Sequence, residues 1–249
     1  MIISNTTISP HSLKRSGVGA TPLISTMKYE WYFNNVQNAS ANIITIPDTG
    51  TVGGLNISNP ALSNKPTASS IGGKVSELYD GIDDYLYKSN TNFLKGMSTW
   101  MLTIVVKHIT GANIYFSAYN ETNANAEGWY IQYTAGGNLI LVAHNSSGVY
   151  VIPINHSIAL VNGTDYIFTF AYDGTNVKLY NQTTEIFTAV AANPIQRPTQ
   201  TDNIAVSALI RPAFSNVFGK SNNGYIGADE FNLTRLNANV ATLKSNFSI

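Results

Sequence analysis

The sequence predicts an all-β fold in which many short strands pack as a sandwich or a barrel. Short segments that alternate apolar and polar residues recur about every 8–12 residues. Turn-forming pairs such as Asp-Gly and Gly-Gly separate these segments. No internal repeat of about 20–50 residues indicates a solenoid or a propeller. A β-rich chain of 249 residues is commonly a single domain.

The N-terminal part has a different character. Residues 1–28 are rich in Ser, Thr, Gly and Pro and lack a sustained hydrophobic period. This composition predicts a flexible arm that either docks on another surface or stays disordered. We therefore expect an arm over 1–28 and one domain over 29–249, with a first short strand at 29–33. Residues 47–74 are rich in turn signals and predict long surface loops with one or two short strands.

From residue 75 onward the strand signals become regular. The segment around Leu78, Ile82 and Tyr85 contains a turn at Asp80-Gly81. The further expected strands are 101–108, 114–118, 128–134, 139–143, 149–154, 204–210 and 225–233.

Residues 128–134 show the period of two most clearly. Trp129, Ile131 and Tyr133 alternate with Tyr130 and Gln132. A strand that is half buried must turn one of the two adjacent aromatic residues into the core. We expect Trp129 to point inward and Tyr130 to point outward.

Residues 165–189 read as a hairpin. Tyr166, Phe168, Phe170 and Tyr172 share one face of the first strand, and Asp173-Gly174 then turns the chain. An Asp-Gly pair between alternating apolar residues is a strong hairpin signal. We expect this aromatic row to lie in the core.

One segment near the C-terminus has a helical period. Within residues 236–247, Val240, Leu243 and Phe247 recur at helical spacing. Asn237 or Asn239 is the expected N-cap, because a short polar side chain can accept a backbone N–H bond there.

Composition excludes several functional classes. Charged residues make up 11% of the chain, against about 25% in ordinary soluble domains, and the formal net charge is zero. Nucleic-acid binding and a polybasic membrane patch both need a basic excess, so we expect neither. No apolar run approaches the roughly 18 residues of a membrane span. The chain has no cysteine, and its start lacks the pattern of a signal peptide, which predicts synthesis in a cytoplasm.

Three segments in order resemble the laminin-G-like branch of the concanavalin A-like lectin/glucanase superfamily. Residues 78–86, LYDGIDDYL, are similar to the family's "FDGxDDYV" strand-turn-strand. Residues 170–181, FAYDGTNVKLYN, resemble its hairpin "YDGxxxxLYVNG". Residues 227–233, GADEFNL, with the helix after them, resemble its closing "GxIDEVRIYN" segment.

The resemblance covers about residues 75–249 and implies a jelly-roll β-sandwich of two antiparallel sheets. Asn181-Gln182 departs from the family's Asn-Gly turn, and the glycine before Asp229-Glu230 is displaced by one residue. The arm and residues 29–74 exceed the family core. The fold hosts many functions, so it does not by itself imply one.

The superfamily includes glycoside hydrolases, which need two carboxylates facing each other across a sugar. Its glucanases carry them on one strand as Glu-x-Asp-x-x-Glu, and this sequence has no such run. In a strand, the adjacent Asp83 and Asp84 would point to opposite faces, as would Asp229 and Glu230. The four histidines form no zinc-binding pattern. We expect no catalytic residues and no enzymatic activity.

Two kinds of binding site have candidate residues. Asp83, Asp84, Asp173 and Asp229 are of the type that binds calcium at the loop rim of a lectin-like sandwich, although turn and strand-end roles are the favoured alternative. Sugar binding needs an exposed aromatic ring beside amide or hydroxyl groups. Tyr130, Gln132 and Tyr150 are the candidates for it. No other cofactor is expected.

These observations favour a non-enzymatic, lectin-like structural or binding module on a virion surface, such as a bacteriophage capsid decoration or fibre protein. The arm would anchor it to other virion or surface proteins, and the sandwich would face outward toward cell-surface glycans. A homo-oligomer or a larger assembly is expected, since a weakly charged surface gives little protection against association. The alternative is an extracellular carbohydrate-binding module of a bacterial surface or secreted protein. A glycoside hydrolase is the third possibility.

Overall fold

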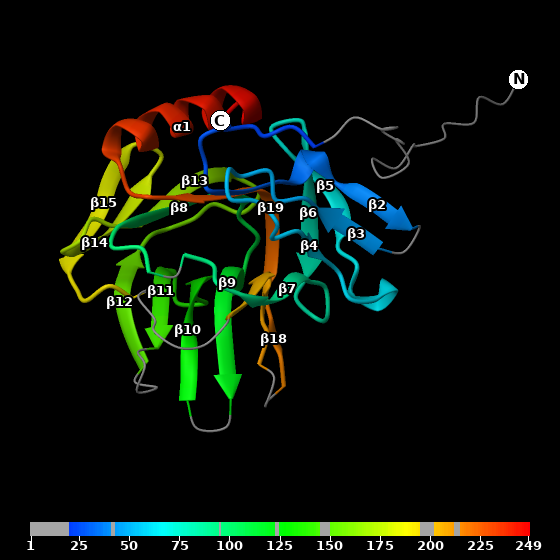
Figure 1. The fold of residues 1–249 in the computed structure, drawn as a ribbon, viewed down its shortest axis with the longest axis horizontal. Helices are drawn as coiled ribbons and strands as arrows, with labels where there is room; N and C mark the ends of the chain where they lie inside the picture. Colours follow the sequence, from blue (N-terminus) through cyan, green and yellow to red (C-terminus); the bar gives the residue numbers. More distant parts are fainter. Residues whose placement is uncertain are drawn as a thin grey trace, which may run out of the picture.

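The chain folds as a sandwich of two antiparallel sheets with one helix packed on its outside (Figure 1). The computed structural model describes residues 20–40, 43–94, 96–122, 125–144, 150–194, 202–211 and 215–249. The all-β prediction and the C-terminal helix are confirmed. No helix in this described part is long and apolar enough to cross a membrane.

The first sheet, sheet A, has the strand order β15-β14-β13-β8-β19-β6-β5, and β1 also pairs with β19. Its strands are β1 (Tyr29–Tyr32), β5 (Thr67–Ile71), β6 (Lys74–Asp80), β8 (Trp100–Lys107), β13 (Asp165–Tyr172), β14 (Asn176–Asn181), β15 (Thr184–Val190) and β19 (Lys220–Asp229). The hairpin predicted at Asp173-Gly174 joins β13 to β14, next to the edge strand β15.

The second sheet, sheet B, has the strand order β12-β11-β10-β9-β16-β7-β4-β3-β2. Its strands are β2 (Gln37–Ser40), β3 (Ile43–Ile46), β4 (Ile57–Ser58), β7 (Leu86–Thr91), β9 (Asn113–Thr122), β10 (Asn125–Tyr133), β11 (Asn138–His144), β12 (Tyr150–Ser157) and β16 (Asp202–Val206). A small separate hairpin pairs β17 (Ala208–Leu209) with β18 (Val217–Phe218).

The space between the sheets is filled by the inward-facing residues of both. Trp129 of β10 is 1% exposed and stacks on Trp100 of β8, with ring centroids 6.5 Å apart. Phe168, Phe170 and Tyr172 belong to the same core, and Tyr166 packs against it. The expected inward position of Trp129 and the aromatic row of the hairpin are therefore confirmed.

Helix α1 (Leu233–Phe247) covers the outer face of sheet A. Its residues Leu236 and Val240 form a second apolar layer with Met101 and Val105, whose side chains leave β8 on the side away from the first core. The helix begins earlier than the sequence predicts, and its N-cap is Asn232, whose side chain accepts the N–H of Arg235 at 3.0 Å. The expected cap at Asn237 or Asn239 is wrong, because the helix already contains both residues.

Residues 20–28, which the sequence assigns to the arm, contact the second apolar layer. Ile24 and Met27 are buried in it. The buried carboxylate of Glu30 accepts the N–H of Ile24 at 2.6 Å and the hydroxyl of Thr49 at 2.7 Å, which ties this segment to β1. Burial raises the pKa of Glu30, and these hydrogen bonds act against the rise. The expected anchoring role of the arm stays a prediction.

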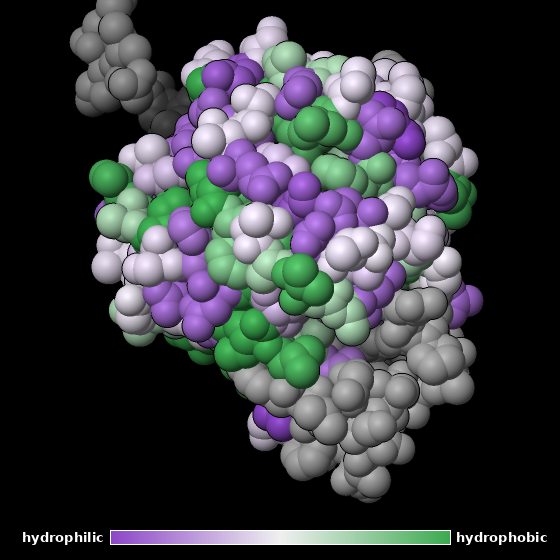
Figure 2. All heavy atoms as spheres, turned by 90° about the vertical axis from the view of Figure 1, so that its left-hand side faces the viewer, coloured by the Kyte–Doolittle hydropathy of each residue, from purple (hydrophilic) through white to green (hydrophobic). Residues whose placement is uncertain are grey.

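The side of the molecule that carries β12, β14 and β15 shows apolar groups scattered among polar ones (Figure 2). Val151, Ile152 and Val190 are its exposed apolar residues on edge strands. Scattered apolar groups of this kind are ordinary on soluble proteins. The described residues of this side therefore form no single apolar surface.

Candidate functional site

The outer face of sheet B carries the residues that the sequence assigns to sugar binding. Along β10, Trp129, Ile131 and Tyr133 enter the core, so the alternating Tyr130 and Gln132 point to the outside. Both outward side chains are partly exposed. The expectation that Tyr130 faces outward is confirmed.

Two further aromatic rings form a chain of contacts with Tyr130. Tyr119 of β9 packs edge-on against Tyr130 with ring centroids 6.2 Å apart, and against His144 of β11 with centroids 5.4 Å apart. Ile114 and Leu209 pack against these rings. These five residues are called the Tyr130 patch below.

A glycine makes room for this arrangement. Gly128 pairs directly with Tyr119 across β9 and β10 and has a φ of +141°. A β-carbon at Gly128 would lie 2.6 Å from the Cα of Tyr119 and would occupy the space of its ring. The ring of Tyr119 therefore lies over the glycine and against the sheet.

Gln132 extends the site along β10, and the backbone of Tyr150 lies beside it. Gln132 pairs with Ile114 on one side and Ile140 on the other, which places it two residues along β10 from Tyr130 on the same face. The backbone of Tyr150 pairs with His144. This register puts Tyr150 next to the Tyr130 patch, and its side chain lies outside the described residues.

The calcium candidates Asp83 and Asp84 do not lie in a strand. They belong to the turn between β6 and β7, which agrees with the turn roles that the sequence favours for them, and the opposite-face geometry of a strand does not apply. Carboxylate oxygens of Asp80, Asp83 and Asp84 come within 4.8 Å of one another. Among the described residues this is the one group of three His, Asp or Glu side chains gathered so closely.

The buried member of this group is Asp84, and its carboxylate accepts the backbone N–H of Asp80 at 3.3 Å. Burial is the main cause that raises the pKa of Asp84 to about 6, and the neighbouring carboxylate of Asp80 adds to the rise. A bound cation would lower the mutual repulsion of the three carboxylates.

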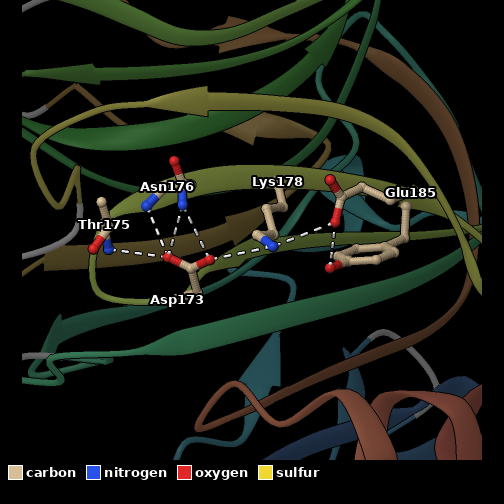
Figure 3. A network of polar contacts seen from close by, with 6 residues as sticks. Asp173, Thr175, Asn176, Lys178 and Glu185 are labelled. Carbon is tan, nitrogen blue, oxygen red and sulfur yellow. Dashed lines mark hydrogen bonds and ion pairs between the residues drawn. The ribbon is translucent and has the colours of Figure 1, made fainter.

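Asp173, the third candidate, binds groups of the hairpin in which it lies (Figure 3). Its Oδ1 accepts the N–H groups of Thr175 and Asn176 at 3.0 and 2.8 Å, and its Oδ2 lies 3.2 Å from the ammonium of Lys178. Lys178 also lies 3.4 Å from Glu185. Burial alone would raise the pKa of Asp173, but these hydrogen bonds outweigh it and lower the pKa to about 2. Asp173 therefore acts as a turn residue.

Asp229, the fourth candidate, lies at the end of β19 and is 1% exposed. Its Oδ2 pairs with the guanidinium of Arg235 in the first turns of α1, and its Oδ1 accepts the N–H of Glu230. The adjacent Glu230 is exposed and pairs with Lys28 at 2.7 Å. Asp229 thus ties the last strand to the helix, and the structure does not bring it together with Asp83 and Asp84.

Sequence reasoning missed Tyr119 and His144. Both lie on strands that the sequence predicts, but β9 runs beyond the expected end at residue 118 and β11 beyond residue 143. The available signal was Gly128, because a glycine inside a strand marks a place where another group approaches closely.

The sequence matches no protein-family model and no curated protein. By structure, the chain is similar to the receptor-binding domain of botulinum neurotoxin C/D mosaic serotype, with a TM-score of 0.59, 9% identity, 87% of this chain and 51% of that chain covered. It is also similar to the receptor-binding domain of botulinum neurotoxin D, with a TM-score of 0.57, 10% identity and coverages of 88% and 53%.

A sialidase, NanB from Streptococcus pneumoniae in its K499G mutant form, matches with a TM-score of 0.52, 12% identity and coverages of 68% and 27%. The chain thus spans from about a quarter to about half of the length of these solved chains. At such low identity these likenesses show a shared β-sandwich fold and no more.

Proposed function

We propose that this domain is a carbohydrate-binding module and that it binds sugar at the Tyr130 patch together with Gln132. The observation that carries the proposal is the outward position of Tyr130 and Gln132 on a sheet face that α1 does not cover. The fold likeness to a neurotoxin receptor-binding domain and to a sialidase chain supports a recognition role. It does so by analogy of fold alone.

The chemistry of the patch suits a sugar ring. The carbon-bound hydrogens of a pyranose stack on an aromatic face, and its hydroxyl groups need hydrogen-bonding partners at the edge. Tyr130 supplies a partly exposed ring, and Tyr119 packs against it and against His144. The amide of Gln132 can both donate and accept hydrogen bonds.

The test is a glycan array of di- to decasaccharides and soluble polysaccharides of plant, bacterial and animal types, probed with and without calcium. We expect binding of at least one glycan class by the wild-type protein. Tyr130→Ala should weaken that binding about tenfold or more, because it removes the stacking ring, while Tyr130→Phe keeps the ring and should retain most of it. A blank array, or equal binding by Tyr130→Ala, would contradict the proposal.

The place where the module acts is a separate proposal. A surface or secreted protein of a bacterium fits a carbohydrate-binding module and is the favoured reading. Attachment to a virion through residues 1–28, which the sequence favours, becomes the alternative, because the similar solved structures do not support it. Truncation before residue 20 tests attachment without removing the buried Ile24 and Met27. If the truncated protein still joins particles as the full chain does, the arm is not the anchor.

Glycoside hydrolysis is the competing function. The three clustered carboxylates of Asp80, Asp83 and Asp84 share one turn, whereas a glycosidase needs its two carboxylates on opposite sides of the scissile bond, about 5–9.5 Å apart. We expect glycans bound on the array to be recovered intact after long incubation. Release of reducing ends that Tyr130→Ala abolishes would favour the enzyme.

A further inference from the structure

We infer that the outer face of sheet B carries a second sugar-binding subsite, formed by Tyr85, Tyr87 and Phe218, which acts together with the Tyr130 patch on long glycans. This inference rests on the proposed function and extends it to the length of glycan that the module prefers. The three residues are called the Tyr87 patch below.

The Tyr87 patch is an aromatic surface in its own right. The ring of Tyr85 lies 5.6 Å from that of Tyr87 and 5.5 Å from that of Phe218, centroid to centroid. All three side chains are partly exposed, whereas Leu86 between the two tyrosines is buried in the core. Aromatic residues that a fold leaves partly open in a cluster are typical of recognition surfaces.

The backbone register places both patches on the same face. Tyr130 pairs with Ser117, Ser117 pairs with Ala205, and Ala205 pairs with Tyr87. Directly paired residues of neighbouring antiparallel strands point to the same side of a sheet. Three strand spacings separate the two tyrosines, which corresponds to about 14 Å between their positions.

The hairpin of β17 and β18 rests on the middle of this row. The small residues Ser117 and Ala205 are buried there, and the hydroxyl of Ser117 donates to the carbonyl of Ala208 at 2.7 Å. Leu209 of the hairpin packs into the Tyr130 patch, while Phe218, paired with Ala208, packs against Tyr85. The hairpin is thus a ridge with one aromatic patch on each side.

The groups around the Tyr87 patch favour a sugar as its occupant. Beyond Tyr87 the same row continues through Ser58 and Thr45, which are both partly exposed. Uncharged hydroxyls beside aromatic rings match the alternating apolar faces and hydroxyl edges of a pyranose. A broad apolar partner would instead leave these hydroxyls buried without hydrogen bonds, which is costly.

The distance between Tyr130 and Tyr87 predicts how affinity depends on glycan length. About 14 Å exceeds the length of a disaccharide, so short glycans can occupy one patch at a time. A long glycan can engage both, and the second contact then forms at a high effective concentration. Affinity should therefore rise steeply between disaccharides and hexasaccharides of one linkage type.

The experiment uses the full chain and the glycan series of one linkage type that the wild-type protein binds on the array, from disaccharide to decasaccharide. Tyr87→Ala and, separately, Phe218→Ala should lower affinity for hexasaccharides and longer glycans at least about tenfold, with disaccharide affinity unchanged within about twofold. Tyr87→Phe keeps the ring and should retain the gain with length. The melting temperature of each variant shows whether it folds. If Tyr87→Ala fails to fold, Phe218→Ala still tests the subsite, because it removes a partly exposed ring.

Each other outcome overturns the inference in a recognisable way. If both alanine variants bind long glycans as tightly as the wild-type protein does, the second subsite does not exist. The proposal that sugar binds at the Tyr130 patch would then still stand. Equal loss for disaccharides and long glycans would make the Tyr87 patch the primary site and overturn the division into two. A dimer in sedimentation that Tyr87→Ala dissociates would show a second copy of the chain as the occupant. A blank array for the wild-type protein would overturn both proposals.

Discussion

The ring of Tyr119 lies over its cross-strand partner Gly128, in space that any larger residue would fill. This contact affects the positions of other rings on the outer face of sheet B, because Tyr119 packs edge-on against both Tyr130 and His144. The absence of a side chain at Gly128 therefore leaves room for the ring of Tyr119, which contacts Tyr130 on the same strand as Gly128 and His144 on β11.

Replacement of Gly128 tests this arrangement. Gly128→Ala should lower the free energy of unfolding by more than about 1 kcal/mol, because alanine is strained at a φ of +141° and its β-carbon would meet the backbone and the ring of Tyr119. Glycan binding should weaken as well, since the ring must move. Urea unfolding and the glycan array measure the two effects.

Gly136→Ala is the matched control. The β-carbon at residue 136 would meet its nearest neighbour, Thr134 Oγ1, at an ordinary 3.7 Å. We expect little change in stability and none in binding. If both variants behave alike, the close approach of Tyr119 does not shape the site.

The alternation of apolar and polar residues predicts which side chains of one strand face the core and which face outward. It places Trp129 inside and Tyr130 outside correctly, because both depend only on local alternation. It does not show that Tyr119 lies over Gly128, because the register between strands is set by the whole sheet. The pattern also does not show that the carboxylates of Asp80, Asp83 and Asp84 approach one another, because the path of the turn before Leu86 brings them together.

The pKa of Asp84 predicts a pH-dependent stability. Burial and the neighbouring carboxylates raise this pKa in the folded protein to about 6 from a usual value of 3.8. The contribution of Asp84 to the free energy of unfolding is therefore fully present below pH of about 4 and is lost as the pH rises through about 6. Asp84→Asn, which cannot ionise, should stabilise the protein at pH 7 and flatten this part of the profile.

Urea unfolding between pH 4 and pH 7 in the presence of a chelator measures the difference, because the chelator keeps divalent cations off the carboxylates. Asp84→Asn retains an oxygen that can accept the N–H of Asp80, so the packing of the turn is preserved. A pH profile with the same slope in both proteins would contradict the prediction.

For Asp173 we expect a pH dependence of stability opposite to that of Asp84. Its pKa of about 2 lies below the usual 3.8, because the N–H groups of Asn176 and Thr175 and the ammonium of Lys178 outweigh the effect of burial. Its contribution is present above pH of about 4 and is lost as the pH falls through about 2. Asp173→Ala should cost about 1–2 kcal/mol at neutral pH, because the hairpin loses these charged hydrogen bonds.

Thr175→Ala is the control for the hairpin, since the exposed Thr175 contributes its backbone N–H to Asp173 and alanine keeps that group. Urea unfolding at pH 7 should show almost no change for this variant. A loss for Asp173→Ala no larger than for Thr175→Ala would contradict the assigned role of the carboxylate.

Two truncations separate the arm from the domain. Removal of residues 1–28 deletes Met27, which is fully buried, and the Ile24 N–H that binds Glu30. It should destabilise the protein by at least about 2–5 kcal/mol more than removal of residues 1–19, the usual range for loss of a buried large apolar side chain. Thermal and urea unfolding of the two truncated proteins give the comparison, and equal stability would contradict the packing of residues 20–28.

Calcium binding at Asp80, Asp83 and Asp84 stays a prediction that isothermal titration can decide. Three carboxylates whose oxygens lie within 4.8 Å can supply part of the 6–8 oxygen ligands that calcium takes, with carbonyl groups and water for the rest. So few protein charges favour a weak site, with a dissociation constant on the order of 10⁻⁴–10⁻³ M. Asp83→Asn should abolish the binding heat. Asp173→Asn should retain it, because Asp173 lies in the hairpin of β13 and β14 and pairs with Lys178. The absence of any heat in the wild-type protein would leave the three carboxylates as turn residues.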